Sequence, residues 1–192
     1  MARSARVRAL RVVLALVVLA LMCDGLACLG QSGAPVSASD VQAAYIYNFG
    51  KFISWPGRTD TAPFAICVVG DDGFGATLDS LIANETIQGR KIAERRMSSV
   101  AGAETCDIVY LGASEGKRVA SDLDALKDRP VLTVSGLPDF VDRGGMIQFV
   151  LQNNRVRFAV NLASAERARL QLSSELLKVA AYVKPQPIGE AR

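Results

Sequence analysis

The chain of 192 residues contains no histidine. Histidine is the base of Ser-His-Asp and Cys-His catalytic sites and the commonest side-chain ligand of zinc and copper. Its absence excludes both kinds of catalytic site and removes the most frequent ligand from any metal site. The sequence also shows no nucleophile with a positioned base. It therefore predicts a protein that is not an enzyme and carries no cofactor or metal.

Nucleotide-binding and hydrolase motifs are missing as well. The segment Gly70–Gly75 matches neither G-x-G-x-x-G nor a P-loop, and its two aspartates would repel a phosphate, so we interpret it as a tight turn. Ser114 and Lys117 match S-x-x-K, but the partner motif K-T-G is absent. Asp122 and Asp124 flank a leucine on an expected helix, so we expect them to face solvent rather than form a glycosidase pair.

The mature part of the chain has no excess of charge. The net charge is +3, and the leader alone accounts for it through Arg3, Arg6, Arg8 and Arg11 against Asp24. A nucleic-acid-binding protein would show a clustered basic patch. The largest basic run, residues 90–96, is interrupted and is typical of the solvated face of a strand. No nucleic-acid partner is predicted.

The N-terminus has the order of a secretory signal peptide. Four arginines precede the apolar run Val12–Met22, and small and polar residues follow from Cys23 to Ala38. The run is shorter than the roughly 20 residues of a membrane span. We therefore expect a signal peptide at 1–30, a linker at 31–38, export, and no membrane insertion after processing. Two alternatives stay open: an uncleaved N-terminal anchor, and a lipid anchor on Cys28.

Two of the four cysteines belong to the mature domain. Cys23 and Cys28 lie in or beside the leader, which leaves Cys67 and Cys106. Two cysteines in an exported chain more often form a disulfide than a reactive pair, and their spacing excludes C-x-x-C redox chemistry. A bridge would close a loop of about 40 residues, worth roughly 3–4 kcal/mol in the chain-entropy description.

Residues 39–184 are predicted to form a single α/β domain, followed by a flexible tail at 185–192. Ser37 and Asp40 fit a capping box, and Trp55-Pro56 ends the helix that follows. Apolar runs and helical periodicity then alternate. The predicted strands are 64–70, 89–97, 107–112 and 131–134, and the predicted helices are 74–83 and 117–127. This alternation predicts a three-layer α/β/α sandwich with a largely parallel central sheet.

The C-terminal part is predicted to contain a hairpin and a helix. Asn153-Asn154 suits a type I′ turn between 146–152 and 155–162, which would form an antiparallel edge. The turn pairs residues of one face: Leu151 with Val156, Phe149 with Phe158, and Ile147 with Val160. We expect a closing helix over 164–183, whose core stripe is Ala168, Leu172, Leu176, Val179 and Ala180.

The first helix is rich in aromatic residues, although aromatics are only 6% of the chain. Tyr45, Phe49 and Phe52 are expected to pack in the core. One helix does not bury every side, so Tyr47 or Trp55 is expected to be partly exposed, and exposed aromatics are favoured anchors for a partner. With the basic Arg90, they are the predicted partner-binding residues.

From this helix onward the sequence resembles the YfiR-like family of periplasmic regulators, over about residues 39–182. The matching segments, in chain order, are Ala44-Tyr45-Ile46-Tyr47-Asn48-Phe49, Trp55-Pro56, Ile66-Cys67-Val68-Val69-Gly70-Asp71, Gly89-Arg90, Cys106-Asp107-Ile108-Val109, Leu132-Thr133-Val134, Gly144-Gly145-Met146-Ile147, Arg157-Phe158-Ala159-Val160-Asn161, and Ser173–Ala181 with Leu176-Leu177.

The resemblance implies a non-enzymatic periplasmic repressor that forms a homodimer. Such a protein binds the periplasmic sensor domain of an inner-membrane diguanylate cyclase and lowers cyclic-di-GMP and biofilm formation, and envelope redox stress relieves the repression. The family's paired cysteines correspond to Cys67 and Cys106. Some members have a second pair toward the C-terminal half, which this chain lacks, so a redox switch built on that pair is in doubt here.

Two other functions are considered. The first is a periplasmic small-ligand-binding module, with a pocket near the strand ends where open α/β sheets bind ligands. The second is an enzyme, which the absence of histidine and of a positioned base argues against.

Overall fold

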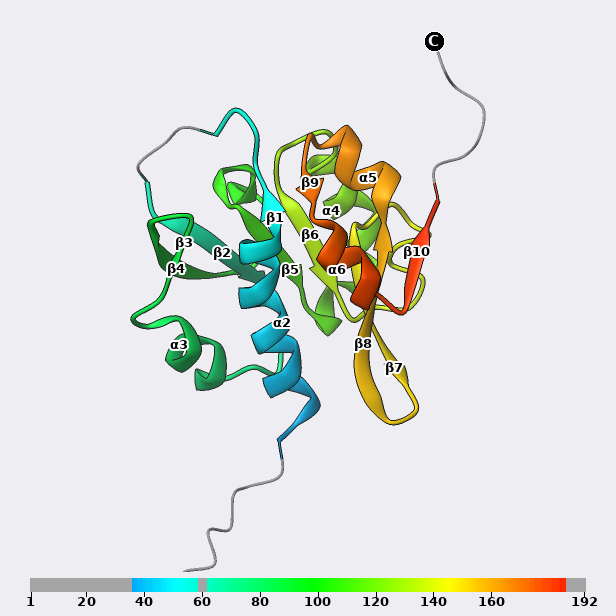
Figure 1. Cartoon of the computed structure of the whole chain (residues 1–192), viewed down its shortest axis with the longest axis horizontal. Coiled ribbons are helices and arrows are strands. Elements are labelled where there is room, and N and C mark those ends of the chain that lie inside the picture. Colours follow the sequence, from blue (N-terminus) through cyan, green and yellow to red (C-terminus); the bar gives the residue numbers. More distant parts are fainter. Residues whose placement is uncertain (1–35, 59–61, 186–192) are drawn as a thin grey trace, which may run out of the picture. The chain divides into compact units, whose positions relative to one another are not determined.

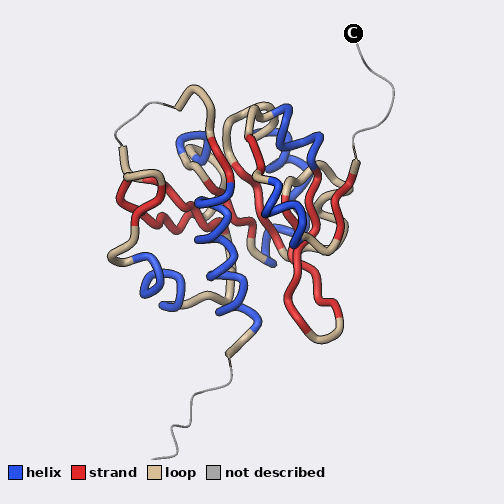
Figure 2. Tube along the Cα trace, viewed as in Figure 1, coloured by secondary structure: helices blue, strands red, loops and turns tan. Residues whose placement is uncertain are grey.

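The computed structural model describes residues 36–58 and 62–185 (Figures 1 and 2). The predicted signal peptide, residues 31–35 of the linker and residues 186–192 of the tail lie outside the described residues. The elements are α2 (Ala38–Phe52), β1 (Ile53–Ser54), β2 (Phe64–Val69), α3 (Ala76–Ile82), β3 (Thr86–Ile87), β4 (Arg90–Met97), η1 (Ala103–Thr105), β5 (Ile108–Leu111), η2 (Ala113–Lys117), α4 (Val119–Ala125), β6 (Leu132–Ser135), β7 (Ile147–Gln152), β8 (Arg155–Asn161), α5 (Leu162–Arg167), β9 (Gln171–Leu172), α6 (Ser174–Val179) and β10 (Tyr182–Lys184).

Eight strands form one curled, mostly parallel sheet in the order β10-β8-β7-β6-β5-β2-β4-β3. The pairs β4/β2, β2/β5, β5/β6, β6/β7 and β8/β10 are parallel, whereas β7/β8 and β3/β4 are antiparallel. The short strands β1 and β9 pair separately. The predicted fold class is confirmed.

The two faces of the sheet carry separate hydrophobic clusters. Side chains of a strand alternate between faces, so β2 sends Phe64, Ile66 and Val68 to the cluster that includes α2 and α6. It sends Ala65, Cys67 and Val69 to the cluster that includes α4. In Figure 1, α2 and α6 lie in front of the sheet and α4 behind it. The result is the three-layer arrangement that the alternating pattern predicted.

The N-terminal capping box is present as predicted. The Asp40 amide donates to Ser37 Oγ at 3.1 Å, and the Ser37 amide donates to Asp40 Oδ2 at 2.9 Å. These hydrogen bonds satisfy backbone donors at the helix start. They also lower the pKa of the Asp40 carboxyl, because the hydrogen bonds favour its charged form.

The hairpin register is confirmed, but its place in the sheet is not the edge. Asn153 and Asn154 have φ of 50° and 58°, as a type I′ turn requires. The three predicted cross-strand pairs are all present. However, β10 pairs in parallel with β8 and covers the hairpin's outer side, from Tyr182 opposite Ala159 to Lys184 opposite Asn161.

The predicted closing helix over 164–183 is wrong, because the chain turns twice in that stretch. Arg169 has φ of 60°, and hydrogen bonds from Leu170 N to Ala165 O and from Arg169 N to Glu166 O, both 2.9 Å, form a Schellman motif that ends α5. β9 then pairs with β1, and Ser173 caps α6 by accepting a hydrogen bond from Leu176 N. The stretch expected to form one helix is therefore divided among α5, β9, α6 and β10.

The loops at the carboxyl ends of β2 and β5 pack against each other. Asp71 N donates to Ser114 Oγ at 3.0 Å, and Ala113 N donates to Asp71 O at 2.9 Å. Gly70 has φ of 74°, and a Cβ there would lie 2.1 Å from Ser114 Oγ. The segment is the tight turn that we expected, and Ser114 serves to hold it.

Asp122 does not face solvent as predicted. It is 6% exposed, whereas Asp124 is exposed. Burial first, and then the neighbouring Glu115, raises the pKa of the Asp122 carboxyl. Glu115 is itself buried and pairs with Arg118 at 2.7 Å.

Candidate functional site

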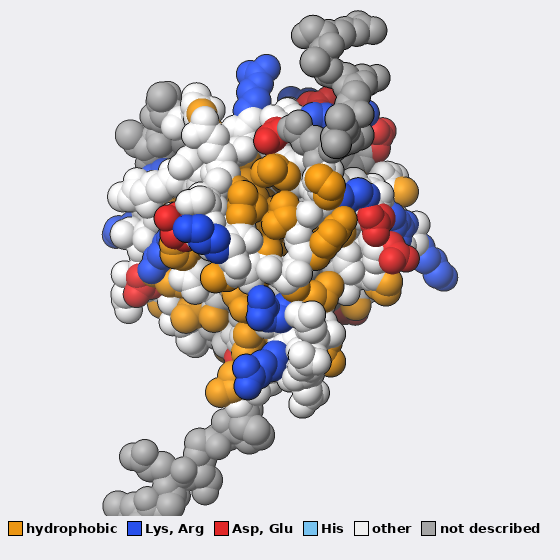
Figure 3. Space-filling view, turned by 45° about the vertical axis from the view of Figure 1, so that its right-hand side comes forward, with side chains coloured by type: hydrophobic (Ala, Val, Ile, Leu, Met, Phe, Trp, Pro, Cys, Tyr) orange, Lys and Arg blue, Asp and Glu red, His pale blue; other side chains and the backbone are white. Residues whose placement is uncertain are grey.

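An apolar groove of about 340 Å³ lies between α2, α6 and β8. In the space-filling view, hydrophobic side chains gather at the centre of the face that carries these helices (Figure 3). The groove is lined by Tyr45, Asn48, Phe49, Phe52, Phe158, Glu175, Leu176 and Val179. Six of these eight residues are aromatic or aliphatic, so the groove suits an apolar occupant.

The floor of the groove is an ordered aromatic cluster. Phe49 and Phe158 meet edge to face with ring centroids 5.1 Å apart, and both are fully buried. Tyr45 meets Phe158 edge to face at 5.3 Å and stacks on Phe49 at 5.9 Å. Because these rings fix one another, the floor is preformed rather than dependent on a ligand for its shape.

Two large side chains on the walls of the groove stand open to solvent. Phe52, the last residue of α2, is 42% exposed, and Val179, the last residue of α6, is 54% exposed. The sequence assigned both to the core, and both assignments are wrong. Clustered apolar exposure of this kind marks interaction sites on soluble proteins.

Two basic side chains lie at the α6 end of the groove. Lys51 is not one of them, because its ammonium lies 4.0 Å from the centre of the Tyr47 ring, and Tyr47 does not line the groove. Arg157 Nη2 donates to Val179 O at 3.0 Å, which places a guanidinium at the end of α6. Lys178 is exposed next to Val179, and Glu175 is the one acidic residue in the lining. The two basic side chains at the end of α6 favour an acidic group of a partner at that point.

Tyr47 and Trp55 are buried, so the exposure that motivated their selection is absent. Tyr47 is 8% exposed, and its hydroxyl donates to Glu85. Trp55 is 5% exposed and packs edge to face on Phe64 at 5.2 Å. Neither residue is among those that line the groove. Their role in partner binding stays a prediction, while the exposed apolar positions of the helix belong to the groove.

Arg90 is engaged inside the protein. Its Nη1 and Nη2 donate to the two carboxylate oxygens of Asp107 at 2.9 and 3.0 Å, and its Nε donates to Ala62 O at 2.6 Å. Asp107 is fully buried, also pairs with Arg58 at 3.1 Å, and accepts from Ala65 N at 2.7 Å. Arg90 therefore ties β4 to the start of β5, and partner binding through it remains an untested prediction.

The predicted disulfide between Cys67 and Cys106 is present, with a Cα–Cα distance of 6.1 Å. It joins the middle of β2 to the residue after η1, and both cysteines are fully buried. Arg58 Nη1 donates to Cys106 O at 3.0 Å, so the bridge and the Asp107 ion pairs share one anchoring point. A buried bridge of this kind is accessible to a reductant only when the surrounding layer opens.

A carboxylate cluster lies at the other end of the sheet, around Arg96. Arg96 contacts Glu94 at 2.8 Å and Asp79 at 3.7 Å and also pairs with Asp72. The Glu94 side chain is 7% exposed, and burial together with the Asp79 carboxyl raises its pKa to about 7 against the pull of Arg96. One guanidinium therefore faces three carboxyl groups, and Glu94 holds a proton near neutral pH.

Residues 36–58 and 62–185 contain neither a cluster of metal ligands nor a candidate membrane-spanning helix. In those residues no three histidine, cysteine, aspartate or glutamate side chains are arranged to hold a metal ion. No helix in them has the length and apolar character to cross a bilayer.

Comparisons with known proteins agree with this geometry. The sequence model of the YfiR/HmsC-like family matches residues 39–181. Two solved structures share the fold, each covering 77% of this chain and 60% of its own length. A conserved domain protein from Vibrio cholerae O1 biovar eltor has a TM-score of 0.53 at 14% identity. An ABC domain in complex with L-Trp from Streptococcus pneumonia has a TM-score of 0.51 at 9% identity.

Proposed function

Because the chain belongs to the YfiR/HmsC-like family, whose members are periplasmic regulators of diguanylate cyclases, we propose that it binds and represses the periplasmic sensor domain of an inner-membrane diguanylate cyclase. Repression lowers cyclic-di-GMP and biofilm formation. The observation that carries the proposal is the solvent-open groove with Phe52 and Val179 on its walls.

The groove has the shape of sites that bind an amphipathic helix of a partner protein. Two helices, α2 and α6, flank a preformed aromatic floor. An amphipathic helix of the sensor domain would place its apolar face on the exposed Phe52 and Val179 and its acidic side toward Lys178. Behind the groove, the disulfide and the Asp107 ion pairs stiffen the sheet on which the floor rests. A rigid frame lowers the entropy lost on binding.

The test is a binding assay of the purified protein against the periplasmic domain of each membrane diguanylate cyclase of the source organism. We expect one domain to bind the wild type, and Phe52→Gln and Val179→Gln to weaken binding at least tenfold, about 1.4 kcal/mol. Leu151→Gln is the matched control, because Leu151 is 69% exposed but lies in β7 beside the hairpin turn, outside the groove lining. Binding by none of the domains, or equal binding by all variants, would contradict the proposal.

The same proposal includes the homodimer and the periplasmic location that the resemblance implies. Light scattering of the purified protein measures the first, and cell fractionation measures the second. A monomer at all concentrations would remove the dimer from the proposal and leave the cyclase partner in place.

A small-ligand-binding module is the second candidate. The pocket predicted from the sequence would lie beside the carboxyl ends of the strands, where the loops after β2 and β5 pack against each other. The observation in favour of this candidate is a cavity elsewhere, at the junction of α4 and α5. Saturation by a small molecule, with no cyclase domain bound, would favour the module.

A further inference from the structure

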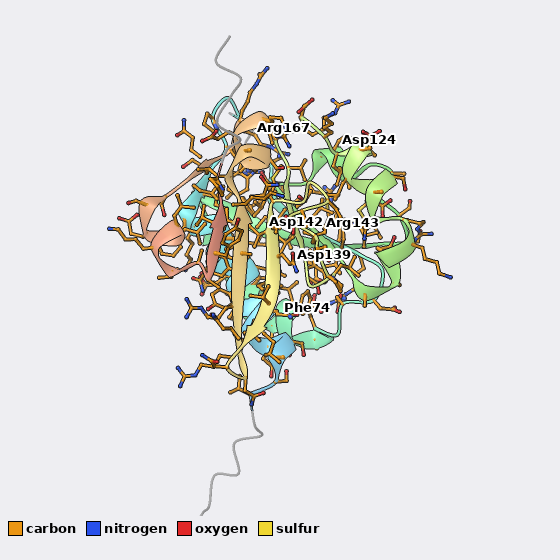
Figure 4. The ribbon with its side chains drawn as sticks, turned by 90° about the vertical axis from the view of Figure 1, so that its right-hand side faces the viewer. Phe74, Asp124, Asp139, Asp142, Arg143 and Arg167 are labelled. Atoms are coloured by element: carbon orange, nitrogen blue, oxygen red, sulfur yellow. A yellow bond between two sulfur atoms is a disulfide. The ribbon has the colours of Figure 1, made fainter. Side chains whose placement is uncertain are left out.

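A second cavity, of about 240 Å³, lies where α4, α5 and the β6–β7 loop meet. It is separate from the apolar groove, since none of its lining residues is shared with that groove. Figure 4 shows Asp124, Arg143 and Arg167 on three different segments that border it. It adjoins the amino-terminal ends of β6 and β7, where Thr133 and Met146 line it.

The inner wall of this cavity is apolar and rigid. Leu123, Leu126 and Met146 line it and are 9%, 2% and 5% exposed. Thr133 is also buried, and its hydroxyl oxygen accepts a hydrogen bond from Met146 N at 3.1 Å. This contact fixes the start of β7 against β6, so the wall holds its shape when the cavity is empty.

Arg143 is presented to the cavity by a tightly constrained loop. Its amide donates to Asp139 O at 2.9 Å, and Gly145 N donates to Phe140 O at 2.9 Å. Gly144 has φ of 103°, a conformation that favours glycine, and a Cβ on Gly145 would lie 2.2 Å from the Phe140 ring. The backbone at Arg143 is therefore positioned before any ligand binds.

Arg167 and Lys127 bring two more positive charges from other elements. Arg167 Nη2 donates to Ser164 Oγ at 2.8 Å, and Ser164 is 4% exposed, so the guanidinium is tied to the cavity lining. Lys127 follows α4 and also lines the cavity. Within the described part of the chain, neither Arg143 nor Lys127 forms an ion pair.

We infer that this cavity binds a small monocarboxylate with an apolar body. The carboxylate lies between Arg143 and Arg167, whose planar guanidiniums match its two oxygens. The apolar body contacts Leu123 and Met146. Asp124 and Asp128, on the α4 side of the cavity, repel a second negative charge and so disfavour phosphate and dicarboxylates. The cavity is smaller than the roughly 300–1,000 Å³ typical of drug-sized ligands, which limits the ligand to a small molecule.

The test is a titration of the ¹⁵N-labelled full chain with phenylacetate, followed by amide chemical shifts. We expect saturable shifts confined to residues 143–146 and 164–167. The double variant Arg143→Gln, Arg167→Gln should bind at least tenfold more weakly, with a dispersed spectrum that shows it is folded. Arg155→Gln is the matched control, because it removes the same charge from β8 beside the hairpin turn and should bind like the wild type.

Inorganic phosphate and succinate are titrated in parallel, and neither should saturate these amides. The inference is overturned if phenylacetate gives no saturable shift, if the folded double variant binds as the wild type does, or if phosphate binds as tightly as phenylacetate. The cyclase-binding assay does not involve these residues, so the two proposals fail separately.

Discussion

The two faces of the central sheet are built on different principles. On the α2 and α6 side, the core is aromatic and continues into an open groove, where Phe52 and Val179 meet solvent. On the α4 side, mainly aliphatic residues, together with Phe140, surround a buried disulfide. The α4 side, with its disulfide, supports the sheet, and we call it the frame. The α2 and α6 side leaves apolar surface that a partner would cover. A binding protein needs both, because a surface is specific only if its support is rigid.

Neighbouring phenylalanines on α2 give the largest contrast on the groove face. Phe49 is fully buried among aromatic rings, so Phe49→Ala should lower the free energy of unfolding by about 3–5 kcal/mol. Phe52 is 42% exposed, so Phe52→Ala should cost less than about 1 kcal/mol while weakening partner binding. Urea unfolding measures both. Equal losses of stability would mean that Phe52 belongs to the core after all.

The second prediction concerns how much the Cys67–Cys106 disulfide stabilises the α4 side of the sheet. Replacing Cys67 and Cys106 with alanine should lower the free energy of unfolding by about 3–4 kcal/mol. The reason is that the bridge joins two residues that are 39 positions apart in the sequence and so closes a long loop. We expect the variant, at a temperature where it stays folded, to bind the partner within about twofold of the wild type, as a structural staple would. Reductant should act on the wild type only slowly. A tenfold change in affinity on reduction of the folded protein would instead make the bridge a switch.

Asp107 is the electrostatic counterpart of the bridge. Asp107→Ala leaves Arg58 and Arg90, whose side chains are 16% and 13% exposed, beside each other without their shared carboxylate. Removing one partner of a buried pair costs about 3–5 kcal/mol, and the partial exposure of both arginines places this variant at about 3. Asp124→Ala, on exposed α4 surface, should be neutral within about 0.5 kcal/mol. Thermal unfolding of the two variants measures whether Asp107 stabilises the fold more than the exposed Asp124 does.

The features predicted correctly from the sequence are those set by short-range chemistry. The capping box depends on residues three apart, and the hairpin register follows from strict alternation around Asn153-Asn154. The buried strands follow from apolar runs. Each of these patterns has a single structural solution within a few residues.

The incorrect predictions depend on contacts between distant segments. Arg169 ends α5 in a left-handed conformation that glycine usually adopts at this position. Because the residue is not glycine, the sequence did not indicate that the helix ends there. Trp55 and Phe52 are equally apolar and three residues apart, and only the packing of Phe64 on Trp55 and the position of α6 decide which one is buried. The groove could not be predicted because α6 itself was not.

The smallest effect concerns pH and the cluster around Arg96, which lies on the same side of the sheet as the groove. The pKa of Glu94 is raised from 4.5 to about 7, chiefly by burial. Between these values the folded protein holds a proton that the unfolded chain has released, so stability falls as pH rises through this window and is flat above it. Glu94→Gln removes this dependence and faces Asp72, Asp79 and Arg96 as a neutral group. Arg96 and Asp79 are 46% and 56% exposed, so solvent screening reduces the effect of the cluster to about 1 kcal/mol. We expect the variant to melt about 2–4 °C above the wild type at pH 8 and level with it at pH 4.5. The exposed Glu104→Gln should show no such difference. If the gap between the Glu94 variant and the wild type were the same at both pH values, Glu94 would titrate normally, and the cluster would be an ordinary ion pair rather than a proton-holding one.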